Sequence, residues 1–349
     1  AGSGAFNSTV GYGRAQIDMR NASVILTLRD GTVTDGLEKG IYLEGAGITP
    51  VIERVHVANN NDASYGSGSA IYQRSINMQP SYADLTFSGN DLDEVTIGDA
   101  GGSLTQDVTL GSANYGFDCG FTVCQLTVPA GFTLTVESDT LLDFYSSHGI
   151  TVEDEGSLIA EGTATQPITF TSQLAAAGDT SQYWYGLWAK QGSTLRLDHC
   201  DISYAQTTNY GKGGLEINTD NAEVSNSHIH HNADDGVVIK GNSESTLHPS
   251  FTNVDVTDNG QGGVYLSAGL LGVDLSLTWE GGSIRRNGDA GVRGQTWRSD
   301  ISPTFTDVTV RDNGHQGTQV YQKRGIDFSD GDGRIHPVLE NVTLAGNTG

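Results

Sequence analysis

The sequence is poor in basic residues and in long apolar runs. Its 349 residues include 18 Lys and Arg against 42 Asp and Glu, which gives a formal net charge of −24. Such a surface repels an exposed phosphate backbone, so nucleic acid is not expected as a partner. The chain also has no run of about 18 apolar residues, the length that would cross a bilayer as a helix. A membrane span is therefore not expected.

Cysteine is scarce, at three residues. Three thiols cannot all pair with one another, but Cys119 and Cys124 are close enough in sequence to form a disulfide across a small loop in an oxidising compartment. Cys200 is then left over. The first residues lack the basic and apolar regions of a signal peptide, so we expect an exported protein whose signal has been removed, located outside the cell or on its surface.

Glycine is abundant, at 47 residues, whereas proline occurs seven times. An excess of glycine without an excess of proline excludes collagen and proline-rich disorder. Thr, Ser, Asn and Asp fill most of the polar positions, and lysine occurs five times. This polar mixture favours strands and turns over helices.

A repeat of apolar residues runs through most of the chain. Its clearest copy is Phe305, Val308, Val310 and Asn313, and neighbouring copies follow 26 to 34 residues apart. A period in this range indicates a solenoid or an array. Seven of eight aligned copies carry Asn at the fourth position, and the eighth has Ala205. The seven asparagines are Asn60, Asn90, Asn232, Asn259, Asn287, Asn313 and Asn347.

A second apolar strand follows the asparagine by about four residues, as in Gly236-Val237-Val238-Ile239 and Gly40-Ile41-Tyr42-Leu43. The alternation has period two, and no segment has the 3.6-residue period of the helices that a parallel open sheet needs on its faces. Strands that recur without crossover helices must pair with their copies in the coils above and below. The sequence therefore predicts an all-β protein, a single-stranded parallel β-helix of about twelve coils. An Asn at the corner can tolerate the left-handed backbone conformation, and stacked Asn side chains can form a hydrogen-bonded ladder along the axis.

The middle of the chain opens a fresh β-helical stretch. It contains Val-Pro-Ala-Gly at 128–131 and Pro-Ile-Thr-Phe-Thr-Ser at 167–172. This order resembles the right-handed parallel β-helix repeat proteins of bacterial cell surfaces, with the architecture of the pectate-lyase-like superfamily. The resemblance covers residues 125–349 well and 1–91 more loosely, and it implies a right-handed helix and secretion. Three segments follow: β-helical coils in 1–91, an insertion or junction in 92–124, and the main β-helix in 125–349.

Histidine and aspartate gather on one outward face of the predicted coils. Equivalent positions in neighbouring coils lie one strand spacing apart, about 4.8 Å. His228 then lies between Asp201 and Asp255, and His230 shares its face. A flanked imidazole could bind a divalent metal or act as a general acid or base. The alternative is a solvated imidazole whose pKa is raised by neighbouring carboxylates.

A second group of carboxylates consists of Asp220, Asp234 and Asp235. The segments that carry them are similar to the Asn-Thr-Asp and Asp-Asp motifs of polygalacturonase-type β-helical hydrolases, whose acid and base carboxylates converge on one glycosidic bond. No Gly-His-Gly follows, however, and the repeat alignment puts Asp235 beside Gly213. We interpret the similarity as an accident of repeat composition and keep the three residues as catalytic candidates.

A calcium site is a further possibility in the segment Asp-Phe-Ser-Asp-Gly-Asp-Gly. Its candidate ligands are Asp327, Asp330 and Asp332. Alternating Asp on a loop can surround Ca²⁺ with oxygen ligands. The same pattern is also ordinary turn chemistry, which we favour.

Three outward aromatic residues, Trp188, Tyr265 and Tyr42, could stack against sugar rings on a lateral face. They could equally cover loops.

The functional expectation follows from the regular repeat and from the lack of a geometrically complete catalytic set. We favour an extracellular structural or adhesive β-helix over an enzyme. The last coil is a full repeat that stops where the next strand would begin, so the chain is expected to be a unit of a larger surface protein or a filament subunit that stacks end to end. The partners are then a second copy or a cell-surface polysaccharide. The alternatives are a lyase or hydrolase of acidic polysaccharide and a non-catalytic carbohydrate-binding module.

Overall fold

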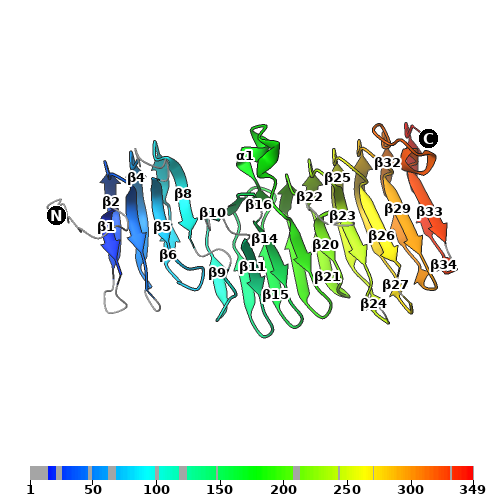
Figure 1. Cartoon of the computed structure of the whole chain (residues 1–349), viewed down its shortest axis with the longest axis horizontal. Helices are drawn as coiled ribbons and strands as arrows, with labels where there is room; N and C mark the ends of the chain where they lie inside the picture. The colour runs from blue at the N-terminus through cyan, green and yellow to red at the C-terminus, as the bar shows by residue number, and fades with distance from the viewer. Residues whose placement is uncertain are drawn as a thin grey trace.

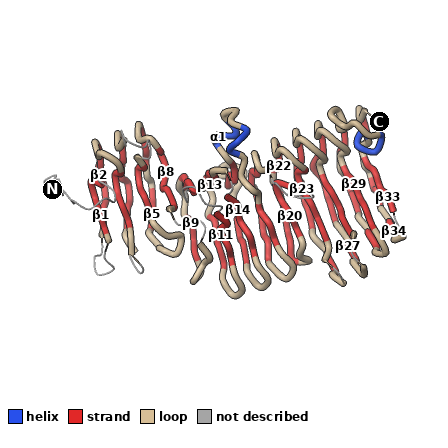
Figure 2. The backbone as a smooth tube through the Cα atoms, viewed as in Figure 1, coloured by secondary structure: helices blue, strands red, loops and turns tan. Residues whose placement is uncertain are grey.

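The computed structural model describes residues 15–20, 26–45, 49–61, 68–98, 102–117, 124–146, 148–206, 213–242, 244–269, 271–330 and 332–348. Strands follow one another along the long axis of the molecule in a solenoid (Figure 1). In the described residues, helical structure is limited to α1 (Gln173–Ala176) and two short 3₁₀ segments, η1 (Thr180–Gln182) and η2 (Val320–Lys323). Figure 2 shows that strands and loops make up almost all of the rest. The predicted parallel β-helix is confirmed.

One row of parallel strands runs along the whole described solenoid, each strand paired with the next. Its members are β1 (Ala15–Met19), β3 (Lys39–Leu43), β5 (Ser69–Gln73), β8 (Leu92–Ile97), β10 (Asn114–Phe117), β13 (Leu141–Phe144), β16 (Ile168–Thr171), β19 (Cys200–Ser203), β22 (His228–His230), β25 (Ser250–Thr257), β28 (Thr278–Arg285), β32 (Thr309–Arg311) and β36 (Thr343–Ala345).

The same sheet contains a second row that joins the first at the long strands β25 and β28. The other strands of this row are β9 (Val108–Leu110), β12 (Thr133–Val136), β15 (Ser157–Glu161), β18 (Thr194–Asp198), β21 (Asn221–Ser225), β31 (Thr304–Thr306) and β35 (Val338–Glu340).

An eight-stranded parallel sheet forms another face of the coils from residue 124 onward. It contains β11 (Cys124–Val128), β14 (His148–Val152), β17 (Leu187–Ala189), β20 (Gly213–Ile217), β23 (Asp235–Lys240), β26 (Val264–Ala268), β29 (Val292–Thr296) and β33 (Ile326–Asp330). Two four-stranded sheets complete the described fold. They contain β2 (Thr27–Thr34), β4 (Val51–Ala58), β6 (Ser81–Ala83) and β7 (Thr86–Ser88), and β24 (Thr246–Leu247), β27 (Asp274–Leu275), β30 (Asp300–Ile301) and β34 (Arg334–Ile335).

The core consists of inward columns in which one side chain per coil stacks on its copy in the next. Phe251 lies parallel to Trp279 with ring centroids 4.3 Å apart, and Trp279 stacks in turn on Phe305 at 6.3 Å. All three rings are buried. Burial of a large apolar side chain contributes about 1.5–3 kcal/mol, so each buried ring of this column stabilises the solenoid.

The corner asparagines form ladders of hydrogen bonds along the axis. The backbone N–H and the side-chain Nδ2 of Asn259 donate to Oδ1 of Asn287, at 3.1 and 2.9 Å. The same pair of bonds joins each of Asn232, Asn287 and Asn313 to the Asn of the following coil, and joins Asn60 to Asn90.

The left-handed conformation that the corner Asn could tolerate is found one residue before it. The positive φ belongs to the preceding position, as at His231 (52°), Asp258 (58°), Arg286 (54°) and Asp312 (58°). The ladder requires the backbone N–H and the amide of Asn to point along the axis together. The left-handed bend of the chain falls on the residue before the Asn.

Residues 92–117 contribute β8, β9 and β10 to the continuous sheet. Strands β8 and β10 pair with each other in parallel, with Val95 opposite Tyr115. Through this pair, β3 with its Gly-Ile-Tyr-Leu motif belongs to the same row of strands as β13. The later copies of the motif lie in the eight-stranded sheet instead. The division into three segments stays a prediction.

Two remaining predictions concern cysteine and the membrane. Cys200 is buried with its side chain in the core, as its alignment with apolar residues predicted. Cys119 and the side chain of Cys124 lie outside the described residues, so their disulfide stays a prediction. Within the described chain, no helix is long and apolar enough to cross a membrane.

Candidate functional site

Among the described residues, a group of one carboxylate and two imidazoles lies on the outer face of β19 and β22. Asp201 pairs in register with His228, and Ser203 pairs with His230. Because side chains alternate along a strand, Ile229 is directed into the core while both histidines point outward. Their rings stack with centroids 4.0 Å apart.

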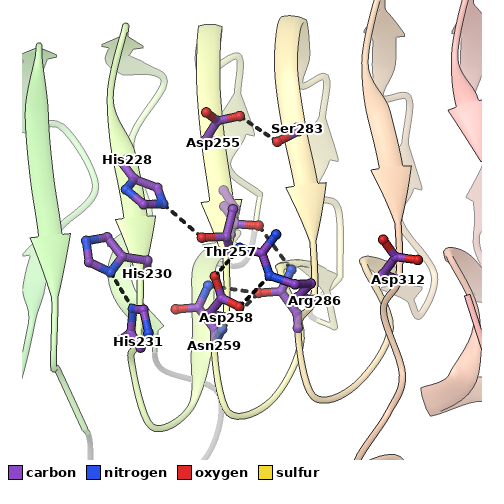
Figure 3. A network of polar contacts seen from close by, with 12 residues as sticks. His228, His230, His231, Asp255, Thr257, Asp258, Asn259, Ser283, Arg286 and Asp312 are labelled. Carbon is purple, nitrogen blue, oxygen red and sulfur yellow. Dashed lines mark hydrogen bonds and ion pairs between the residues drawn. The ribbon is translucent and has the colours of Figure 1, made fainter. Parts of the chain in front are cut away.

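Asp201 contacts both imidazoles. Its Oδ2 is 2.9 Å from Nε2 of His230 and 3.6 Å from Nδ1 of His228. The opposite nitrogen of each ring has another partner: Nε2 of His228 lies 2.8 Å from the Thr257 hydroxyl, and Nδ1 of His230 lies 2.6 Å from Nδ1 of His231. Figure 3 shows these two outer contacts. Each ring is therefore fixed in orientation, with one nitrogen facing the carboxylate.

The charge on Asp201 is stabilised by this arrangement. Burial raises the pKa of the Asp201 carboxyl, but hydrogen bonds and charge from His228 and His230 outweigh burial, and the pKa lies well below its usual value. Burial lowers the pKa of His231, and the charge of His230 lowers it further. The group therefore combines a stable carboxylate with closely spaced imidazoles.

Asp255, which was predicted to flank His228, has a different partner. It pairs in register with His228, but its Oδ1 accepts a hydrogen bond of 2.6 Å from the Ser283 hydroxyl (Figure 3). Farther along the same face, Arg286 forms an ion pair with Asp258 at 2.6 Å. Within the described residues, the ligand atoms that come together are those of Asp201, His228 and His230.

Asp235 is the first residue of β23, and Asp234 immediately precedes it. The register Gly213–Asp235 is the one that the repeat alignment predicted. Asp220 is exposed and follows the far end of the neighbouring strand β20. The three catalytic candidates therefore do not converge on one point.

Asp235 nevertheless has an unusual environment. Its Oδ1 accepts the backbone N–H of Gly262 at 2.7 Å. Burial raises the pKa of this carboxyl to about 7, and the charges of Asp234 and Asp289 act in the same direction, while the Gly262 hydrogen bond and Arg293 oppose the rise. The carboxyl can therefore take up or release a proton near neutral pH.

Two of the three calcium candidates are paired with arginines in the described structure. Asp327 is buried and forms an ion pair with Arg324. Asp332 lies 3.9 Å from Arg298. The side chain of Asp330 lies outside the described residues. A Ca²⁺ site formed by these three aspartates stays a prediction.

The aromatic candidates do not form one platform. Trp188 and Tyr265 belong to the eight-stranded sheet, where Glu216 and Val238 lie between them in register. Tyr42 lies on β3, which belongs to a different sheet, and stacks on Tyr72 at 5.4 Å. Sugar binding through these residues stays a prediction.

Sequence reasoning missed three residues of these groups. Thr257 is two positions after Asp255, so the repeat places it on the same face as His228. Its hydroxyl, a hydrogen-bonding group on that face, was the signal that could have identified it as a partner of His228. His231 holds a left-handed corner, outside the alternation of the strands. Asp289 lies two residues after the corner Asn287, two coils beyond Asp235. It lies outside the aligned strands, so the alignment did not place it near Asp235.

A match to a protein-family model agrees with the architecture. Residues 169–332 match the family model described as a right-handed β-helix region. The A-module of the mannuronan C-5 epimerase AlgE4 from Azotobacter vinelandii is similar in structure, with a TM-score of 0.32 and 14% sequence identity over 69% of this chain and 87% of that module. No curated protein matched in sequence. The chain is thus a parallel β-helix repeat protein, with a right-handed β-helix region over residues 169–332.

Proposed function

We propose that the protein is an extracellular structural β-helix that lengthens by stacking its coils end to end with those of a second copy. The observation that carries this proposal is the regular spacing of the apolar columns and corner asparagines, which recurs from coil to coil up to the coil formed by β35 and β36. Its side chains Val338, Leu339 and Leu344 are 44%, 43% and 52% exposed. The extracellular setting rests on the resemblance to cell-surface β-helical proteins.

The exposed leucines continue the inward columns of the core. Leu339 follows Phe305 in register, and Leu344 follows Val310. Phe305 and Val310 are fully buried because the next coil covers them. A coil of matching spacing would cover Leu339 and Leu344 in the same way and would pair with the strand edges beside them.

A coil of the same chain has that spacing. From Asn232 to Asn313 the backbone N–H and the side-chain amide of the corner Asn donate to the Asn of the following coil. Asn347 holds this position in the last described coil. A second copy carries the same apolar columns and its own corner asparagines. Head-to-tail contact of this kind does not close on itself, so it generates a filament.

The proposal is tested by weakening the exposed end. The double variant Leu339→Lys, Leu344→Lys places two charges in the column, and Leu271→Lys, at a loop leucine that is 63% exposed, is the matched control. Analytical ultracentrifugation over a concentration series should show assembly of the wild type and of L271K, and monomers of the double variant. Wild-type protein that stays monomeric at high concentration, or equal loss of assembly in L271K, would contradict the proposal.

Turnover of acidic polysaccharide is a second candidate function, favoured by the pKa of Asp235 near 7 beside Asp234, Asp289 and Arg293. A carboxyl that titrates near neutrality is suited to general acid–base catalysis. Wild-type protein would be incubated with polyuronates and with neutral polysaccharides, and product ends would be counted. Activity on polyuronates that is lost in Asp235→Asn and kept in Asp220→Asn would support it. No product from the wild type, or binding without turnover, would reject it in favour of a structural or adhesive role.

A further inference from the structure

We propose that Asp201, His228 and His230 bind a divalent transition-metal ion such as Zn²⁺ on the side of the β-helix. The ligand atoms are one carboxylate oxygen of Asp201, Nδ1 of His228 and Nε2 of His230. All three lie within 4.8 Å of one another. The site is independent of the proposed stacking, because it lies on a lateral face far along the chain from the last coil.

The spacing of the ligand atoms fits a tetrahedral ion. Zinc bonds of about 2.0–2.1 Å to nitrogen and oxygen in a tetrahedron place neighbouring ligand atoms roughly 3.3 Å apart. The distances from Oδ2 of Asp201 to the two imidazole nitrogens are 2.9 Å for His230 and 3.6 Å for His228, one on each side of that value. Small rotations of the carboxylate and the rings are sufficient to accommodate the ion.

The nitrogens that face away from Asp201 are held as in known metal sites. A histidine ligand generally uses its second ring nitrogen in a hydrogen bond that fixes the tautomer and the orientation of the ring. Thr257 provides this contact for His228, and His231 provides it for His230. Both rings therefore present their free edge toward the carboxylate without a large rearrangement.

The donor set selects the class of ion. Two imidazoles with one carboxylate suit Zn²⁺, Co²⁺, Ni²⁺ and Cu²⁺, whereas Ca²⁺ requires six or more oxygen ligands. Both histidines come from a strand that is paired on each side, by β19 and β25, so the ligands are held on a rigid frame. Three protein ligands leave a fourth position for water.

The test is isothermal titration of the purified chain with Zn²⁺, accompanied by the visible absorption of the Co²⁺ form. We expect one ion per chain that Ca²⁺ does not displace, and intense Co²⁺ absorption typical of tetrahedral coordination. His228→Gln and His230→Gln should each abolish this binding. Thr257→Val, which removes an orienting contact, should weaken it by about 10-fold or more.

His56→Gln is the matched control, because His56 also lies on a strand between hydroxyl groups, those of Thr86 and Ser88. It should bind Zn²⁺ like the wild type, and circular dichroism should show all variants folded. Zn²⁺ should also raise the melting temperature of the wild type and of H56Q but not of H230Q. Absence of stoichiometric binding in the wild type, or binding that persists in folded H228Q and H230Q, would overturn the proposal.

Discussion

Replacement of Asn259 by alanine tests the asparagine ladder. The side chain of Asn259 is buried, and it makes four hydrogen bonds. Its Oδ1 accepts the backbone N–H and the Nδ2 of Asn232, at 3.1 and 2.9 Å. Its Nδ2 donates to the carbonyl oxygen of Ile229 at 3.2 Å and to Oδ1 of Asn287 at 2.9 Å. Alanine removes all four bonds.

The expected loss follows from the groups that remain. Oδ1 of Asn287 still accepts the backbone N–H of residue 259, at 3.1 Å in the wild type. The two donors of Asn232 and the carbonyl of Ile229 lose their Asn259 partner in a buried place. Each such group costs about 1–3 kcal/mol, and local relaxation favours the lower part of the range, so we expect a loss of about 3–5 kcal/mol.

The assay is denaturant unfolding followed by circular dichroism, with hydrogen exchange of the flanking coils, because repeat proteins can unfold in parts. The control is Asn221→Ala, at an exposed strand position whose Nδ2 donates to the Thr194 hydroxyl at 2.6 Å, and it should change stability by about 0.5 kcal/mol or less. A loss below about 1 kcal/mol for Asn259→Ala, or one equal to that of the control, would refute the hydrogen-bond reasoning.

Three further predictions concern pH, thiol reactivity and the core. The pKa of Asp235 is raised from 3.8 to about 7 in the folded chain, so the folded state binds this proton more tightly than the unfolded state. The free energy of unfolding that Asp235 contributes therefore falls as the pH rises from about 4 to 7. Asp235→Asn should remove that fall in unfolding measured at pH 5 and pH 8, and parallel curves for the two proteins would contradict it. Burial raises the pKa of the Cys200 thiol, so in a variant with Cys200 as its single cysteine a thiol reagent should react on unfolding and not before. Trp279→Ala should cost about 3–5 kcal/mol, whereas Trp297→Ala, at a ring that is 58% exposed, should cost little, and similar unfolding midpoints would contradict this.

The fold could be predicted because its signal repeats. Each coil restates the spacing of apolar residues and Asn, and pairing between copies follows from that spacing, as the register of Gly213 with Asp235 shows. The position of the left-handed corner could not be predicted in this way, because Asn, Asp, His and Arg all occupy it. The pairing of β8 with β10 also carried no repeat signal, since β8 follows the corner Asn90 but no aligned corner Asn precedes β10.

Only those features of the candidate site that follow from strand register could be predicted from the sequence. Alignment placed Asp201 beside His228, and the period of two placed His230 on the same face. Alignment says nothing of rotamers, so it could not show that Ser283 engages Asp255 or that Thr257 engages His228. Partners that approach from loops, such as Arg298 toward Asp332, lie outside any strand register.

Electron microscopy of the purified protein over a concentration series tests the proposed end-to-end stacking most directly. The 13 described strands of the row from β1 to β36, at one strand spacing each, give a rod roughly 60 Å long. The account predicts continuous filaments with an axial repeat near that length as concentration rises. Isolated rods of about 60 Å at every concentration would contradict it.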